Sequence, residues 1–239
     1  MHTKLAILAL SSFAISAACL GGAFAFGSIG FGEFGLPRCD LAPTGQSVTR
    51  DLAWDGSDSA GIAVPANVHY RRGQGDRVVV TGDSAVVPHV EIVDGSVQLD
   101  CRPSRRNWVR LEVTLPGRPF KSFSLAGLGD MTLDGIDQPD LQLHLAGSGN
   151  IAASGKTSRL ELHIAGAGDA KLGQLLADRV TLHVAGSGNI DVAPKDDLDA
   201  HIVGSGTLML HSEPHSIETH IIGSGRIIHP DGSVSSRHA

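Results

Sequence analysis

The amino-acid sequence predicts an all-β protein, a parallel β-helix or β-solenoid of about six coils, with irregular β coils or a cap at its N-terminal end. Three observations predict this fold class. A G-x-G motif recurs at steps of 18 to 20 residues, apolar residues alternate with polar ones on both sides of it, and no segment shows a helical period. The chain of 239 residues also has 30 glycines and only 4% aromatic residues, which favours short strands and tight corners.

The glycine pairs are predicted to form the corners of the coils. Glycine accepts a positive φ without a Cβ clash, and it lets stacked backbones approach closely. A strand pattern follows each pair, whereas a phosphate-binding loop would be followed by a helix. The predicted corner residues are Gly127, Gly129, Gly147, Gly149, Gly166, Gly168, Gly186, Gly188, Gly204, Gly206, Gly223 and Gly225.

Alternation of apolar residues predicts the strands between the corners, as in Leu141, Leu143 and Leu145. Two or three short strands per repeat cannot form a core alone, so the repeats are expected to stack as parallel strands. Upstream, strands are predicted at 77–81, at 90–99 and at 109–115, with Val109, Leu111 and Val113 in the core. The predicted solenoid covers residues 48–233, with irregular opening strands at 48–124, G-x-G repeats at 125–233 and a disordered tail at 234–239.

The N-terminus has the layout of a secretory signal peptide over residues 1–25. Lys4 precedes an apolar run, and Ala23-Phe24-Ala25 supplies a cleavage site. An uncleaved membrane anchor and a lipoprotein box ending at Cys19 are the alternatives; each exports the body to the periplasm or the cell surface. Residues 26–47, rich in Gly, Pro and Ser, are expected to form a spacer. Removing residues 1–25 leaves Cys39 and Cys101, which predicts one disulfide; two buried thiols are the alternative.

The charge pattern limits the class of partner. The formal net charge is -6, and no basic cluster is longer than two residues, which argues against a nucleic-acid partner. A membrane would be contacted only through the N-terminal segment. The catalytic motifs G-x-S-x-G and H-E-x-x-H do not occur in the sequence.

The repeats resemble the head GIN domain family of auto-transporter adhesins. The resemblance rests on a recurring [LV]-A-GSG-N-I pattern, at Leu145–Ile151 and Val184–Ile190, and on the alternating strand Val109–Pro116 before the first repeat. It covers residues 109–233 strongly and residues 47–106 more loosely. It implies an exported bacterial β-solenoid, and it supplies no catalytic residue to carry over.

A column of histidines is the most unusual feature of the repeats. Each lies three residues before the first glycine of its corner, and the alternation predicts that each points outward. Carboxylates in the column two residues earlier flank three of them, namely Glu161, Asp199 and Glu218. Such a strip could bind a transition metal or respond to pH; the alternative is a duplicated repeat whose imidazoles only stack and form local hydrogen bonds. The five residues are His144, His163, His183, His201 and His220.

Two further groups of polar residues have other predicted roles. A column of Asp130, Asn150, Asp169 and Asn189 follows the corners and is expected to hydrogen-bond to neighbouring turns, rather than to bind calcium. The second group consists of carboxylates in variable turns, which could belong to a carbohydrate-active enzyme only by analogy of fold. These carboxylates are Asp134, Asp137, Asp140, Asp196, Asp197 and Asp199.

Taken together, these features predict an exported, non-catalytic structural or binding module of the bacterial envelope, adhesion-like in character and without a cofactor. The expected partner is an envelope protein, a surface polymer or a second copy of the chain. The first alternative is a periplasmic metal-binding or pH-responsive protein that uses the histidine column. The weaker alternative is a carbohydrate-active β-helix enzyme.

Overall fold

A computed structural model describes residues 37–103 and 110–235. The predicted export segment at 1–25, residues 26–36 of the predicted spacer and Val109 lie outside these ranges. The described residues belong to one compact unit that begins at Pro37. Within them, no helix has the length and apolar character needed to cross a membrane.

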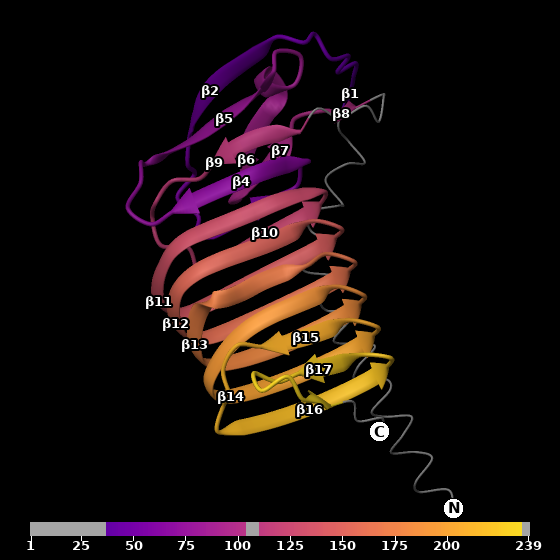
Figure 1. Cartoon of the computed structure of the whole chain (residues 1–239). Helices are drawn as coiled ribbons and strands as arrows, with labels where there is room; N and C mark the ends of the chain where they lie inside the picture. Colours follow the sequence, from indigo (N-terminus) through magenta and orange to yellow (C-terminus); the bar gives the residue numbers. More distant parts are fainter. Residues whose placement is uncertain (1–36, 104–109, 236–239) are drawn as a thin grey trace, which may run out of the picture. The chain divides into compact units, whose positions relative to one another are not determined.

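The predicted all-β solenoid is confirmed. Its long strands bend from one face of a coil to the next and pair in parallel with the strand one coil further on (Figure 1). The solenoid has about five turns, slightly fewer than the G-x-G motifs suggest, because the chain after the last motif forms only two short strands that pair with each other. The solenoid strands are β10 (Ser122–Gly127), β11 (Gly129–Gly147), β12 (Asn150–Gly166), β13 (Ala170–Gly186), β14 (Asn189–Gly204), β15 (Thr207–Leu210), β16 (Ser216–Gly223), β17 (Arg226–Ile228) and β18 (Val234–Ser235).

Glycine is required at the corners for two separate reasons. Gly186 has a φ of +147°, a conformation that other residues rarely adopt, and a Cβ there would lie 1.7 Å from the Gly166 carbonyl oxygen. Gly188, the second glycine of that corner, lacks the positive φ, yet a Cβ would lie 1.9 Å from the Gly168 oxygen. At the first corner only the first glycine has room: a Cβ on Gly127 would meet no atom within 4 Å, whereas a Cβ on Gly129 would lie 1.9 Å from the Ala66 carbonyl oxygen. Backbone stacked on backbone therefore fixes glycine at the inner coils.

Aliphatic columns fill the interior of the coils. Leu143, Leu162 and Leu182 pair in register and are fully buried, as is Ala200 one coil further on. Burial of one such leucine side chain stabilises the fold by about 1.5–3 kcal/mol. Each inward residue packs between its equivalents in the coils on either side, so a change in one coil is felt by two others.

The opening region is built from shorter strands with mixed pairing. β2 and β5 pair antiparallel, β5 pairs antiparallel with β9, and β4 pairs in parallel with both β9 and β11. Strand β4 therefore joins this region to the first complete coil. The strands are β2 (Ser47–Ala53), β3 (Ser59–Ile62), β4 (Ala66–Arg71), β5 (Arg77–Asp83), β6 (Val90–Val93), β7 (Ser96–Leu99) and β9 (Leu111–Thr114), with a 3-10 turn, η2 (Val87–His89), before β6.

An aromatic cluster lies where the opening region meets the coils. Phe120 makes edge-to-face contacts with Trp54, Tyr70 and Phe123, at ring-centroid distances of 5.1, 5.9 and 5.4 Å. The Tyr70 hydroxyl donates a hydrogen bond to the Arg118 carbonyl oxygen at 2.9 Å. These large side chains fill the irregular space that stacked aliphatic residues would leave here, and such contacts add about 0.5–1.5 kcal/mol each beyond burial.

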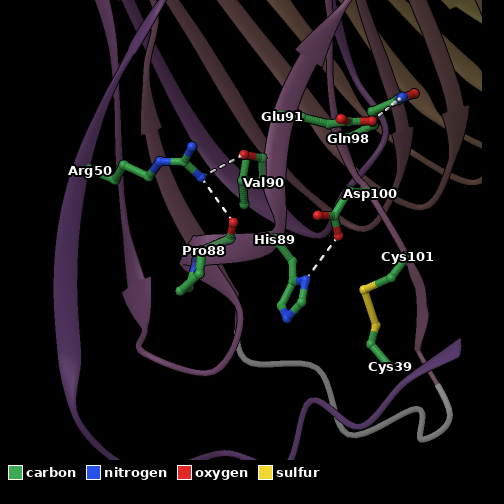
Figure 2. A network of polar contacts seen from close by, with 9 residues as sticks. All are labelled: Cys39, Arg50, Pro88, His89, Val90, Glu91, Gln98, Asp100 and Cys101. Atoms are coloured by element: carbon green, nitrogen blue, oxygen red, sulfur yellow. Dashed lines mark hydrogen bonds and ion pairs between the residues drawn. A yellow bond between two sulfur atoms is a disulfide. The ribbon is translucent and has the colours of Figure 1, made fainter. Parts of the chain in front are cut away.

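The folded unit begins before residue 48. Strand β1 (Arg38–Cys39) pairs with β8 (Arg102–Pro103), and a disulfide joins Cys39 to Cys101 (Figure 2). The buried Asp83 carboxylate accepts hydrogen bonds from the backbone amides of Ala85, Thr44 and Gly45. Although burial opposes them, these bonds lower the pKa of Asp83 to about 2. A disulfide and a carboxylate thus hold residues 39–45, inside the predicted spacer, against the opening strands.

Candidate functional site

The five histidines stack in one continuous column, referred to below as the histidine ladder. They lie on β11, β12, β13, β14 and β16, and each pairs in register with the histidine of the next coil. Successive ring centroids are 5.0, 4.9, 5.4 and 5.0 Å apart, and the interplanar angles are 20° or less. The rings lie on the outer side of the sheet, where stacking leaves most of them half-buried. Only His220, at the end of the ladder, is exposed.

Carboxylates from the neighbouring column contact the middle of the ladder. Glu161 Oε1 lies 2.7 Å from His163 Nε2, and Glu161 Oε2 accepts a hydrogen bond from the Gln142 amide at 3.1 Å. Asp199 Oδ1 lies 3.1 Å from His201 Nε2, but the directions do not meet hydrogen-bond geometry. That oxygen is shielded from solvent and has no hydrogen bond within the described part of the chain. In the middle of the ladder, both Glu161 oxygens thus have hydrogen-bond partners, whereas Asp199 Oδ1 has a close contact with His201 but no hydrogen bond among the described residues.

The ladder keeps two of its imidazoles from ionising easily. Burial lowers the pKa of His144 and of His183, and the charge of His163 lowers both further. Burial also opposes ionisation of Glu161, but hydrogen bonds from His163 and Gln142 outweigh it and lower the pKa of Glu161. A neutral imidazole beside an ionised carboxylate is the state in which both side chains can bind a metal ion.

A third polar column lies on the same face, on the other side of the carboxylate column from the ladder. Arg159 forms an ion pair with Asp140, and Arg179 Nε lies 3.6 Å from Asp197 Oδ2. Between this column and the carboxylate column is a shallow depression of about 480 Å³, lined by the two arginines and by polar residues including Gln142, Glu161 and Thr181. One face thus presents charged, amide, hydroxyl and imidazole groups in three parallel columns; we call it the polar face.

Glu161, His163 and His183 form a cluster more specific than the sequence indicated. Their potential ligand atoms all lie within 4.8 Å of one another. The sequence predicted the histidine column but not this subset. Residue spacing does not show that the Glu161 side chain lies close to histidines on two adjacent coils. A second group, His89, Asp100 and Cys101, is equally close, but Cys101 is in the disulfide and supplies no thiolate (Figure 2).

The opening region contains a polar network that no pattern in the sequence indicated. His89 Nδ1 lies 2.9 Å from Asp100 Oδ1, and the Arg50 guanidinium donates to the carbonyl oxygens of Pro88 and Val90 (Figure 2). These residues come from segments far apart in the sequence and have no repeating pattern. Their contacts join β2 to the η2–β6 segment.

The other predicted polar groups make local contacts. Asn150 donates a hydrogen bond to Asp130 at 2.7 Å, and the Asn189 backbone amide donates to Asp169 at 2.8 Å. These bonds link neighbouring coils at the corners. Most of the turn carboxylates have basic partners: the ion pairs are Asp134 with Arg71, Asp137 with Lys156, Asp140 with Arg159, Asp196 with His215 and Asp197 with Arg179.

The fold and the polar face define a β-solenoid that presents repeated polar columns along its coils. The chain belongs to the family described as "Putative auto-transporter adhesin, head GIN domain", whose model matches residues 61–214. This match confirms the resemblance predicted from the G-x-G repeats. No curated protein matches the chain.

Solved structures show the same fold. A putative adhesin from Bacteroides fragilis is 18% identical, with a TM-score of 0.59 over 78% of this chain and 98% of that one. A putative lipid binding protein from Parabacteroides distasonis is 21% identical (TM-score 0.48; 80% and 98% covered), and a putative adhesin from Parabacteroides merdae is 17% identical (TM-score 0.47; 81% and 99% covered). At these sequence identities the similarity concerns the fold alone, and the evidence for the shared fold is the Bacteroides fragilis structure.

Proposed function

We propose that this protein is an exported, non-catalytic binding module of the bacterial envelope, which holds an extended surface polymer across its polar face. The observation that carries the proposal is the three parallel columns of outward polar side chains, repeated from coil to coil. A polymer with regularly spaced polar groups can contact equivalent side chains on several coils, so that many weak contacts add up. The adhesin description of the family supports this reading.

The architecture of the polar face also suits such a partner better than a small molecule. Small-molecule sites are usually concave and bury most of the ligand. The depression beside the carboxylate column is partly open to solvent, and its Arg159 and Glu161 are already paired with Asp140 and His163. An extended partner can use these groups without being enclosed.

Co-sedimentation with purified peptidoglycan and biolayer interferometry with purified surface polysaccharide test the proposal. A polar-face variant carries His163→Gln, His183→Gln and Arg179→Gln. A matched control carries Lys171→Gln and Asp191→Asn, in an outward column beyond the corners. We expect the wild type and the control to bind one of the polymers, and the polar-face variant to bind at least about tenfold more weakly. Absence of binding to either polymer, or equal binding by all three proteins, would contradict the proposal.

A second candidate function is binding of a divalent transition metal at Glu161, His163 and His183. The favouring observation is that these three side chains place potential ligand atoms within 4.8 Å of one another. Asp199 Oδ1, one coil beyond His183, lies 3.1 Å from His201 Nε2 and has no hydrogen bond among the described residues, so it is a further potential ligand atom. Imidazole with carboxylate suits zinc, copper and nickel. Because the stacked rings are nearly parallel, they must rotate for their nitrogen atoms to converge, so the affinity is expected to be modest.

Isothermal titration with zinc, copper and nickel at neutral pH tests the metal site. We expect His183→Gln to abolish binding, as does replacement of all five ladder histidines by glutamine. His220→Gln is the matched control, because His220 belongs to the ladder but lies outside the cluster, and it should bind as the wild type does. Equal binding by the variant with five replacements would show that the metal is held elsewhere.

A further inference from the structure

The C-terminal end of the solenoid has one closed face and one open face. Strand β17 pairs with β15 on one side and is covered by the antiparallel strand β18 on the other. Strand β16, on the polar face, pairs with β14 only, and no other described strand adjoins it. Figure 1 shows β16 as the last long strand of the stack. An open edge of this length is a template for pairing with another strand.

The backbone of β16 shows which groups are free to pair. The Ser224 amide donates to the Gly204 carbonyl oxygen of the preceding coil at 2.9 Å. Successive residues of a strand direct their N–H and C=O groups to opposite sides, and β16 pairs with β14 without a register shift. The even-numbered residues of β16 therefore face β14, whereas Ile217, Thr219 and Ile221 direct their backbone groups to the open side.

Exposed apolar side chains also gather near this end. Large apolar residues that are exposed in the described structure include five between residues 203 and 234, and Ile222 is 54% exposed and Val234 61% exposed. Ile217, an inward residue of β16, is 37% exposed, although its equivalent Leu198 one coil earlier is 2% exposed. The end of the core is therefore only partly covered. The five residues are Val203, Met209, Ile217, Ile222 and Val234.

We propose that β16 pairs antiparallel with β16 of a second copy of this chain, with a two-fold axis at Thr219, so that two solenoids join end to end. This inference goes beyond the proposed ligand-binding function and does not depend on it. With Thr219 opposite Thr219, Ile217 lies opposite Ile221 of the second copy, and the outward-directed backbone groups of both strands form about six hydrogen bonds.

Charge selects this register over its neighbours. In the proposed register, Glu218 lies opposite His220 of the second copy on the polar face, and the contact occurs twice by symmetry. Residues in such non-hydrogen-bonded pairs bring their side chains close together. A shift by two residues in one direction places Glu218 opposite Glu218, and a shift in the other places His220 opposite His220. Only the proposed register pairs a carboxylate with an imidazole, and it joins the two polar faces into one sheet.

Sedimentation equilibrium of the full chain, over micromolar to millimolar concentrations, tests the proposal. We expect a monomer–dimer equilibrium with no species larger than a dimer. Thr219→Pro removes an amide on the open side without removing a bond to β14, so it should remain folded by circular dichroism and be monomeric. Thr219→Val, which keeps the amide, is the matched control and should dimerise as the wild type does.

A charge exchange tests the register. Glu218→Lys removes the carboxylate opposite His220 and should weaken dimerisation at least about tenfold, whereas the double variant E218K/H220E places a lysine opposite a glutamate and should recover it. The proposal would be overturned if the wild type is monomeric, or if Thr219→Pro dimerises with unchanged affinity. It would also be overturned if the protein assembles beyond two copies through another edge strand, such as β2. A double variant that dimerises no better than Glu218→Lys would overturn it too.

Discussion

Residues 129–223 repeat the same contacts from coil to coil, whereas residues 37–125 use each contact once. In the coils, stacked leucines, glycines and histidines each form a column. In the opening region, a disulfide, an aromatic cluster and the hydrogen bonds of Asp83 each join particular segments. We therefore expect a destabilising substitution in the coils to affect the neighbouring coils as well. A destabilising substitution in the opening region should affect only the segments that it joins.

The largest expected effect comes from a glycine at an inner corner. Gly186→Ala places a Cβ against the Gly166 carbonyl oxygen at a positive φ, so we expect a loss of about 3–5 kcal/mol in the free energy of unfolding. Gly127→Ala is the matched control, because it has a positive φ but open space, and it should cost about 1–2 kcal/mol. Urea unfolding measures both. Equal losses would show that backbone stacking is not what requires glycine.

A core truncation tests how far a defect spreads. Leu162→Ala removes a fully buried side chain between two coils and should cost about 2–5 kcal/mol. Hydrogen exchange should then show faster exchange in β11 and β13 as well as in β12. Val80→Ala, also at a fully buried position, should affect only the opening strands. Protection lost only within β12 would contradict the idea that the layers support one another.

The disulfide should matter for the opening region alone. Cys39 and Cys101 are separated by 62 residues, and replacing both by alanine is expected to cost about 2–4 kcal/mol. Hydrogen exchange should accelerate around β1, β2 and β5, while the coils from β12 onward keep their protection. Faster exchange throughout the coils would show that the two regions unfold as one.

The smallest expected effect is the pH dependence that the ladder contributes. The folded-state pKa values of His144 and His183 are lowered below their usual 6.5, so the unfolded chain binds more protons there. Stability should therefore decline as pH falls from about 6.5, with a decrease of a few degrees in Tm. Replacing both residues by glutamine should flatten this decline. The double replacement should not change a separate loss of stability below pH 3.8. That loss arises because Asp83 has a pKa of about 2 in the folded protein, so the unfolded chain takes up a proton there at higher pH.

The sequence could predict the coils because their contacts recur. Leu143, Gly147 and His144 each have an equivalent one coil further on, so spacing alone indicated which residues would stack and which would point outward. The contacts of Asp83 with Thr44 and of Arg50 with Pro88 occur once and join distant segments, so no pattern indicated them. Within the polar face, the sequence predicted the histidine column. It could not predict that Glu161 hydrogen-bonds to His163 while Asp199 Oδ1 has no hydrogen bond in the described part of the chain, because these differences depend on side-chain geometry.

If the polar face is the binding surface, as we propose, a bound polymer should change the imidazole NMR signals of the histidine ladder. The isotope-labelled protein would be titrated with soluble peptidoglycan fragments and with surface polysaccharide. We predict that resonances of the histidine ladder shift together with one of these polymers, while those of His89 and His215, which lie outside the ladder, stay in place. Binding that shifts His89 or His215 and leaves the ladder unchanged would contradict the account.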